Sequence, residues 1–285
     1  MGNFRIATFN VNSVRSRLPV LERWLKNNRV DCLCLQETKV EDGSFPTPFF
    51  EDLGYHVVFS GEKSYNGVAV ASTVPPDEYG FGLDDGEEPS GRTRIAWCRF
   101  GDLRVANAYV PQGKSIDHPD YPMKLRFFKR MEAFLRSLGV PKERLVLVGD
   151  LNVAPTDIDV THPENKRDHV CFHEEVREAF RSLCSTGLVD VFRKHRPGEG
   201  EFSFWDYRVK GASRGTSDGG STTSSPRLCW RTYPSTATAT GSPDHGRSLR
   251  TIRQWWQNSK YSGFQKAGGL PCQGTVKKGS AGTSG

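Results

Sequence analysis

Two patterns of apolar and polar residues occur in the first 190 residues of the chain. Short runs rich in Val, Ile, Leu and aromatic residues indicate β-strands, whereas apolar residues spaced three or four positions apart indicate helices. Gly101 and Asp102 separate two such runs and predict a hairpin. The expected strands are 4–11, 30–37, 55–60, 66–72, 93–100, 103–110 and 144–152, and the expected helices are 13–28, 121–138 and 173–188.

The order of these elements predicts an α+β fold. Strands alternate with helices, and several of the strand pairings are antiparallel. Two mixed β-sheets packed face to face, with helices outside, fit this order and form a four-layer α/β sandwich.

The character of the chain changes after Ala212. From residue 213 to residue 285, Ser, Thr and Gly are abundant, and ten Lys and Arg stand against two Asp and no Glu, which gives a net charge of +8. The rest of the chain carries −2, so the total of +6 says little about the folded part. Because polar, cationic segments are typically solvated, we expect 212–285 to be a largely disordered basic tail.

Seven cysteines, none of them in a C-x-x-C pair, predict neither a zinc site nor a disulfide framework. The N-terminus carries no charged-then-apolar leader, and no apolar run is long enough to cross a bilayer. We therefore expect a reduced, cytoplasmic protein that has no membrane partner.

Three apolar strands end in side chains suited to a hard cation or a phosphate. The stretch TFNVNS ends on Asn10, CLQETK on Glu37, and VLVGDLN on Asp150 and Asn152. For any one of these residues, the start of a turn is a sufficient explanation. Four together, at the ends of rigid strands and with carboxylate and amide oxygens, predict a site for a cation such as Mg²⁺.

These stretches resemble the exonuclease III-like apurinic/apyrimidinic endonucleases of the endonuclease/exonuclease/phosphatase superfamily. The motifs PTDIDV and WDYR are similar to those of the DNA-repair branch, rather than to those of the relatives that act on phosphoinositides, sphingomyelin or messenger RNA. The matching stretches, in family order, are FNVNSVRSRL, CLQETK, NAYVPQG, VLVGDLNVAPTDIDV, GLVDVFRKHRP and FSFWDYRVKGA.

The resemblance implies a catalytic domain over residues 1–211 that is truncated at its C-terminal end. The implied enzyme is metal-dependent and cleaves the backbone 5′ to abasic sites in duplex DNA, with 3′–5′ exonuclease activity. It also implies Mg²⁺ or Mn²⁺ as the cofactor, double-stranded DNA with abasic sites or 3′ ends as the partner, and a monomeric protein.

The resemblance further assigns roles to individual residues. Glu37 would hold the metal with Asn10 nearby, while Asp150 would deprotonate or orient the attacking water. Asn152 would fix the angle of that water, and Tyr109 would donate a hydrogen bond to a phosphate oxygen.

The same resemblance implies DNA contacts. Trp205 would pack against the abasic sugar flipped out of the duplex, and Arg15, Arg17 and Lys39 would lie at backbone phosphates. Each has an ordinary alternative, because most Trp side chains belong to the core and surface Arg and Lys are common.

One family segment is absent after residue 212. The pattern requires a Trp-Arg-Ile-Asp-Tyr strand and then a Ser-Asp-His turn, and only SPDHG offers candidates, Asp244 for the metal and His245 for catalysis. Back-translated and shifted by two bases, 217–225 can encode Gly-Trp-Arg-Ile-Asp-Tyr-Ile-Leu. We therefore interpret the tail as a frameshift and expect mostly irregular chain beyond residue 212.

Two other functions stay open. One is a catalytically defective DNA-binding product of the same ancestry, because the Asp that should orient the base is missing from the tail. The other is a phosphodiesterase or phosphatase of the same superfamily that acts on another substrate. Chelator-sensitive incision of an abasic duplex would separate the active enzyme from the defective product.

Overall fold

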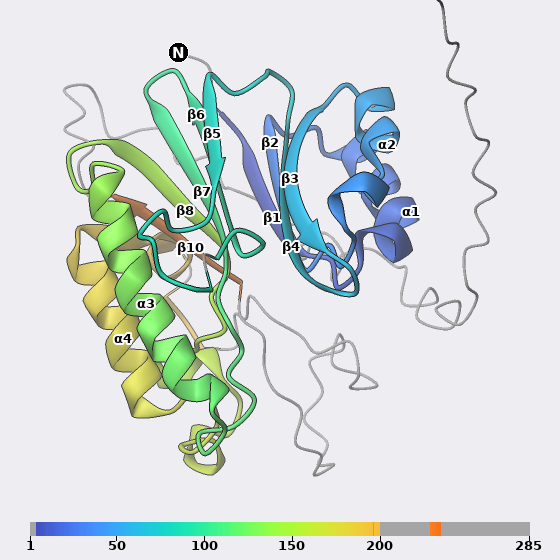
Figure 1. Cartoon of the computed structure of the whole chain (residues 1–285). Helices are drawn as coiled ribbons and strands as arrows, with labels where there is room; N and C mark the ends of the chain where they lie inside the picture. The colour runs from blue at the N-terminus through green and yellow to red at the C-terminus, as the bar shows by residue number, and fades with distance from the viewer. Residues whose placement is uncertain (1–3, 90, 196, 200–228, 235–285) are drawn as a thin grey trace, which may run out of the picture.

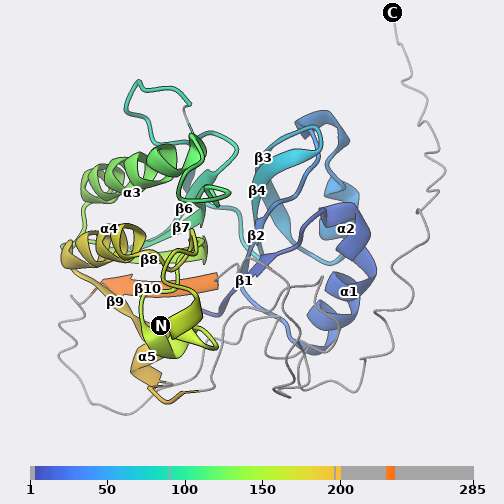
Figure 2. The same cartoon turned by 90° about the horizontal axis from the view of Figure 1, so that it is seen from below.

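The computed structural model describes residues 4–89, 91–195, 197–199 and 229–234. Within them two β-sheets lie between two pairs of helices, which gives four layers (Figures 1 and 2). The predicted α+β sandwich of two mixed sheets with helices outside is therefore confirmed. No helix in the described part of the chain is both long enough and apolar enough to span a membrane.

The first sheet has four strands in the order β1-β2-β4-β3. Strands β1 and β2 are parallel, and the other pairs are antiparallel. Helices α1 and α2 cover its outer face (Figure 2). The elements are β1 (Ile6–Asn10), α1 (Val14–Asn27), β2 (Cys32–Gln36), α2 (Thr47–Asp52), β3 (His56–Glu62) and β4 (Tyr65–Ser72).

The second sheet has six strands in the order β5-β6-β7-β8-β10-β9. Strands β7 and β8 are parallel and are connected through α3, while the remaining pairs are antiparallel. Helices α3 and α4 pack on its outer face (Figure 1). The elements are β5 (Glu78–Phe81), β6 (Ile95–Phe100), β7 (Leu103–Tyr109), α3 (Asp120–Ser137), β8 (Arg144–Asp150), α4 (Glu174–Ser185), β9 (Leu188–Asp190), α5 (Val191–His195) and β10 (Cys229–Pro234).

The inner faces of the two sheets form a common core. Small and β-branched residues such as Cys34, Val70, Val105 and Val146 fill it, so the sheets can approach closely. Polar residues cross the same interface: Gln36 donates from Nε2 to Asn107 Oδ1 at 2.6 Å and to Thr8 Oγ1 at 2.9 Å. Such a network favours one register of the two sheets, because any slip would leave buried polar groups unpaired.

Several short elements differ from the expectation. The apolar pattern did not indicate α2, β5, β9 or α5, which are all six residues or shorter. The predicted Gly101-Asp102 hairpin is present between β6 and β7.

The expectation of mostly irregular chain beyond residue 212 is wrong for one segment. Strand β10 pairs antiparallel with both β8 and β9 and places Cys229 opposite Asp150. Its sequence CWRTYP contains aromatic and β-branched residues, which favour a strand beside buried neighbours. Residues 217–225, on which the frameshift interpretation rests, lie outside the described residues, so that interpretation stays a prediction.

Candidate active site

Four strands bring their C-terminal ends to one edge of the sandwich. Strands β1 and β2 are parallel, with Asn10 opposite Gln36, and β7 and β8 are parallel, with Tyr109 opposite Asp150. Because parallel strands end on the same edge of a sheet, each sheet collects two of these polar ends, and the packing of the two sheets brings both pairs together.

The amide of Asn10 joins the two sheets at this edge. Its Nδ2 donates to Glu37 Oε1 at 2.7 Å and to Asp150 Oδ2 at 2.7 Å. Its Oδ1 accepts a hydrogen bond from the backbone N–H of Asn12 at 3.1 Å, which fixes the orientation of the amide. The Glu37 and Asp150 carboxylates, each about 1% exposed, are thus held on either side of one nitrogen.

Lys39 compensates part of this negative charge. Its Nζ lies 2.9 Å from Glu37 Oε2 and donates to Asn12 Oδ1 at 2.5 Å. The structure therefore places Lys39 within the carboxylate cluster, and its expected contact with DNA stays a prediction. At the start of α1, Arg15 Nη2 donates to Ser44 O at 2.9 Å, and Arg17 Nη1 to Ser16 Oγ at 3.4 Å.

Asn152 is fixed from two directions. Its Nδ2 donates to Val110 O at 2.9 Å, and its backbone N–H donates to Asp150 Oδ1 at 3.1 Å. The residue is fully buried. Asp150 and Asn152, both predicted from the strand-end pattern, therefore lie together, and the second holds one carboxylate oxygen of the first.

The backbone around the cluster is strained. Ser13, Glu37, Lys39 and Asn152 all have positive φ, at 88°, 52°, 53° and 49°. Side chains other than Gly rarely adopt this region, and each such residue costs on the order of 1 kcal/mol or more. Hydrogen bonds from Ser13 N to Glu37 O at 2.8 Å and from Lys39 N to Asn66 O at 2.9 Å hold these conformations.

Gly149, just before Asp150, allows β7 and β8 to come together. It has φ +135°, and a Cβ there would lie 1.9 Å from Ala108 O. Any larger residue would push β8 away from β7 and displace Asp150 with it.

The ring of Tyr109 lies against the guanidinium of Arg94, a contact that the sequence pattern did not predict. The guanidinium of Arg94 lies 4.8 Å from the centre of the Tyr109 ring, and its Nη1 donates to Tyr109 O at 3.4 Å. The backbone N–H of Tyr109 donates to Arg94 O at 2.7 Å. The Gly101-Asp102 hairpin could have predicted this contact from the sequence, because it pairs Ile95 with Ala108 and so places Arg94 beside Tyr109.

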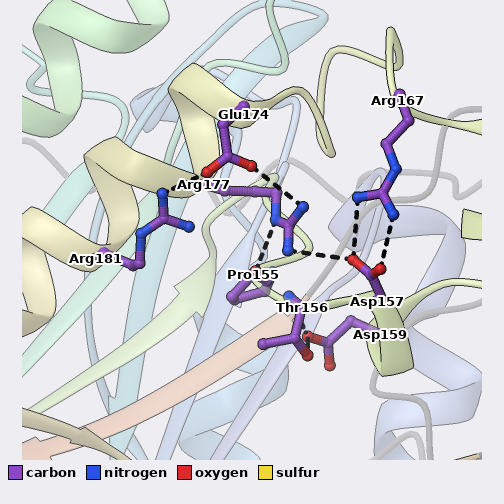
Figure 3. A network of polar contacts seen from close by, with 8 residues as sticks. All are labelled: Pro155, Thr156, Asp157, Asp159, Arg167, Glu174, Arg177 and Arg181. Carbon is purple, nitrogen blue, oxygen red and sulfur yellow. Dashed lines mark hydrogen bonds and ion pairs between the residues drawn. The ribbon is translucent and has the colours of Figure 1, made fainter.

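The loop that follows Asp150 is held by arginines from α4 and from the segment that precedes it (Figure 3). Arg177 Nε donates to Pro155 O at 2.8 Å, and its Nη2 lies 3.2 Å from Asp157 Oδ1. Arg167 bonds the same carboxylate, at 2.8 Å from Nη2 to Oδ2. Thr156 and Asp159 form a capping box over the short 3-10 turn Asp157–Asp159. These contacts keep the chain beyond Asn152 in one path.

The donor chemistry of the cluster fits a hard divalent cation. Glu37 and Asp150 offer carboxylate oxygens, and in the described part of the chain no group of three His, Cys, Asp or Glu gathers. Mg²⁺ is commonly held by one or two carboxylates, with water and substrate phosphate completing its shell. Mn²⁺ accepts the same oxygen ligands, whereas Zn²⁺ and Cu²⁺ are better suited to His or Cys ligands.

Three candidates cannot be placed. Trp205, Asp244 and His245 lie outside the described residues. The structure therefore brings together Asn10, Glu37, Lys39, Asp150 and Asn152, with Tyr109 on the neighbouring strand end.

Comparison with known proteins identifies relatives of the chain. The chain is 34% identical over 218 residues to exodeoxyribonuclease III of Haemophilus influenzae, covering 73% of this chain and 82% of that protein. An AP endonuclease from Archaeoglobus fulgidus is similar in structure, with a TM-score of 0.75 and 44% identity over 81% of this chain and 87% of that one. A 3′ phosphatase from Neisseria bound to a product DNA hairpin has a TM-score of 0.73 and 32% identity, with coverages of 81% and 87%. Residues 7–251 match the model of the endonuclease/exonuclease/phosphatase family, and the chain belongs to this family.

Proposed function

We propose that this protein is a divalent-metal-dependent phosphodiesterase of DNA repair that cleaves the backbone 5′ to abasic sites in duplex DNA, with 3′–5′ exonuclease activity. The observation that carries the proposal is the buried Glu37 and Asp150 pair bridged by Asn10. The relatives named as an exodeoxyribonuclease III and an AP endonuclease support the substrate.

Each residue of the cluster has its own proposed role in the reaction. Glu37 holds the cation, proposed to be Mg²⁺ with Mn²⁺ as a substitute, and Asn10 keeps its carboxylate oriented. When bound, the cation neutralises negative charge that develops on the scissile phosphate. Asp150 accepts a proton from the attacking water or orients it, and its Oδ1 stays aligned through the backbone N–H of Asn152.

Tyr109 is proposed to donate its hydroxyl hydrogen to a phosphate oxygen. Arg94 supports this role, because a guanidinium over the ring restrains the ring and adds positive potential beside the phosphate. The protein is proposed to act as a monomer, and its cytoplasmic location stays a prediction from the cysteine pattern.

A second activity is favoured by one observation. The Neisseria relative of known structure is named a 3′ phosphatase. Removal of a 3′ phosphate uses the same elements, a cation and an oriented water at a phosphorus atom, so we propose it as an alternative reaction of the same site. The defective DNA-binding product and action on a substrate other than DNA remain the competing proposals.

One assay separates these functions. Duplexes with a single abasic site, or with a recessed 3′ phosphate, are incubated with the full chain in Mg²⁺, in Mn²⁺ and in chelator. We expect incision 5′ to the abasic site that requires the cation. Binding of the abasic duplex without incision would favour the defective product, and release of phosphate alone would favour the 3′ phosphatase.

The matched control is an acidic residue of the same loop. Asp157 is 46% exposed and pairs with Arg167 and Arg177, away from the bridged carboxylates. The Asp157→Asn variant should incise at the wild-type rate. A large loss there would show that the assay reports loop stability rather than the chemistry of the cluster.

A further inference from the structure

A fully buried lysine lies next to the residues of the candidate active site. Lys124 belongs to α3 and is fully buried. Its ammonium donates to Asn152 O at 2.7 Å, to Val170 O at 2.8 Å and to Gln112 O at 3.2 Å. The sulfur of Cys171 lies 3.8 Å away. In the described part of the chain this ammonium forms no ion pair, so backbone carbonyls take the place of a counter-ion.

Burying an ammonium is costly, and α3 does not need one for packing. Lys124 lies on the apolar side of α3 between Tyr121 and Phe128, where a methionine would fill the same space. Burial lowers the pKa of Lys124, while the Cys171 sulfur and the Asp150 carboxylate act in the opposite direction. The hydrogen bonds from the ammonium to the three backbone carbonyls offset this free-energy cost of burial.

The three carbonyls belong to two connections, because Gln112 lies between β7 and α3, whereas Asn152 and Val170 lie near the two ends of the connection between β8 and α4. The loops are packed tightly there, because a Cβ on Gly113 would come within 2.9 Å of Val170 Cγ2 and 3.2 Å of Lys124 Cδ. Lys124 is therefore the point at which the loops after the two central parallel strands are fixed to a rigid helix.

Asn152 is the residue for which this matters most. Its backbone is left-handed, and its side chain and N–H hold Val110 O and Asp150 Oδ1. Asn tolerates the left-handed region better than most residues other than Gly, but that region is still less stable than the right-handed one, so a hydrogen bond to the carbonyl helps to hold φ near +49°. Lys124 Nζ holds that carbonyl at 2.7 Å.

We propose that Lys124 is a positioning residue for the phosphodiesterase reaction: its buried ammonium clamps the Gln112, Asn152 and Val170 carbonyls and so sets the Asn152 amide and the Asp150 carboxylate in their working geometry. The inference rests on the proposed function. It predicts that Lys124 acts on turnover rather than on DNA affinity, since the buried ammonium touches no surface that DNA could reach.

A merely structural role is the alternative, and the same helix supplies the control for it. Arg130 is 9% exposed and tethers a different loop, through Asp85 and the carbonyls of Glu87 and Pro89. It makes a comparable number of hydrogen bonds, but none to the active-site loops. A variant at each position should cost stability, and only the variant at Lys124 should cost turnover.

The test compares Lys124→Met, Lys124→Gln and Arg130→Met in the full chain. For each variant, urea unfolding gives the folded fraction, steady-state incision of an abasic duplex in saturating Mg²⁺ gives kcat and KM, and binding in chelator gives the Kd for DNA. We expect kcat of both Lys124 variants to fall by about 10- to 100-fold, as for residues that orient catalytic groups, with KM and Kd within about threefold of wild type. Arg130→Met should keep the wild-type kcat.

Hydrogen exchange of the metal-free protein gives a second readout. Loss of the clamp should raise exchange in segments 110–113, 152–154 and 170–172 in the Lys124 variants, and in 85–89 in Arg130→Met. Should Lys124→Met not fold, Lys124→Gln retains a donor and carries the same expectation.

The outcomes are distinguishable. Wild-type kcat in a folded Lys124 variant, beside an active wild type, overturns the role of Lys124 and leaves the proposed function intact. A similar loss of kcat in Arg130→Met shows a general stability effect and also overturns it. A wild-type protein that incises no abasic duplex in any metal overturns the proposed function, and the positioning role with it.

Discussion

The bridged carboxylates at the strand ends and the arginine network around the following loop use the same chemical groups in opposite surroundings. Glu37 and Asp150 are about 1% exposed, whereas the Asp157 and Glu174 side chains that bind Arg167, Arg177 and Arg181 are 46% and 62% exposed. Water screens the second group and is excluded from the first. The comparison teaches that solvation, rather than the number of ion pairs, sets how strongly each acid interacts with a nearby charge.

The arginine network shows what an exposed pair does to an acid. Hydrogen bonding from Arg167 lowers the pKa of Asp157, and Arg181 does the same for Glu174. Both acids therefore stay ionised at lower pH than a free carboxyl group would. Glu37 and Asp150 instead share an uncharged amide, Asn10 Nδ2, and Lys39 beside Glu37 compensates only part of their charge, so that negative charge stays available to a cation.

The largest effect is expected for Asp150→Asn. Loss of the group that accepts a proton from water should lower incision by about 10²- to 10⁴-fold. The Kd for an abasic duplex should change little, because most affinity comes from phosphate contacts. Rapid-quench kinetics and a binding titration in chelator measure the two quantities. An equal loss of binding and cleavage would contradict the role given to Asp150.

Next comes Glu37→Gln, which should act on the cation. Removing one of two carboxylate charges should raise the Mg²⁺ concentration for half-maximal incision by about tenfold or more, because affinity for hard cations follows ligand charge. A Mg²⁺ titration of the initial rate is the measurement. An unshifted titration with a reduced maximum would place the cation elsewhere.

A smaller effect on stability is expected at Asp85. Hydrogen bonding from Arg130 lowers the pKa of this carboxyl to about 2, from 3.8. The partly exposed pair should contribute about 1 kcal/mol, which Asp85→Asn removes. Because the folded pKa is depressed, the contribution is fully present above about pH 5 and is lost as the pH falls from 3.8 towards about 2.

Urea unfolding of wild type and Asp85→Asn between pH 3 and pH 7 measures this difference. The gap in unfolding free energy should be constant near neutrality and should narrow at the acid end. A gap that widens on acidification would show that Asp85 is not held ionised by Arg130.

The smallest effect is expected for Arg167→Gln. The Arg167 side chain is 53% exposed, so loss of the pair with Asp157 should leave the unfolding free energy almost unchanged, and high salt should erase any difference. Arg177→Gln is the contrasting variant, because Arg177 is 14% exposed and also holds Pro155 O. Equal effects of the two would argue against solvation as the deciding factor.

Strong periodicity made most of the fold predictable. Long amphipathic helices such as α3 and apolar strands such as β8 were predicted within a few residues, because burial imposes their patterns. Elements such as α2 and β5 are too short to carry a period. Strand β10 lies in a polar segment, and its pairing with β8 depends on contacts more than 70 residues away along the chain.

The site was predictable as a set of residues and not as a geometry. Polar strand ends pointed to Asn10, Glu37, Asp150 and Asn152, yet no pattern shows that one amide bridges the two carboxylates or that Glu37 is left-handed. Lys124 did leave a signal, a charge on the apolar side of a helix.

The bridge formed by Asn10 spans 140 residues of sequence, and this has a consequence for biosynthesis. A ribosome adds on the order of ten residues per second, so the half of the cluster carried by the first sheet leaves the exit tunnel roughly ten seconds before Asp150 does. During that interval the nascent chain lacks both the second half of the proposed cation site and the acid proposed to activate water. Under the proposed mechanism, nuclease activity begins only after β8 docks beside β1, so that division of the site between two sheets delays reactivity until both have been translated.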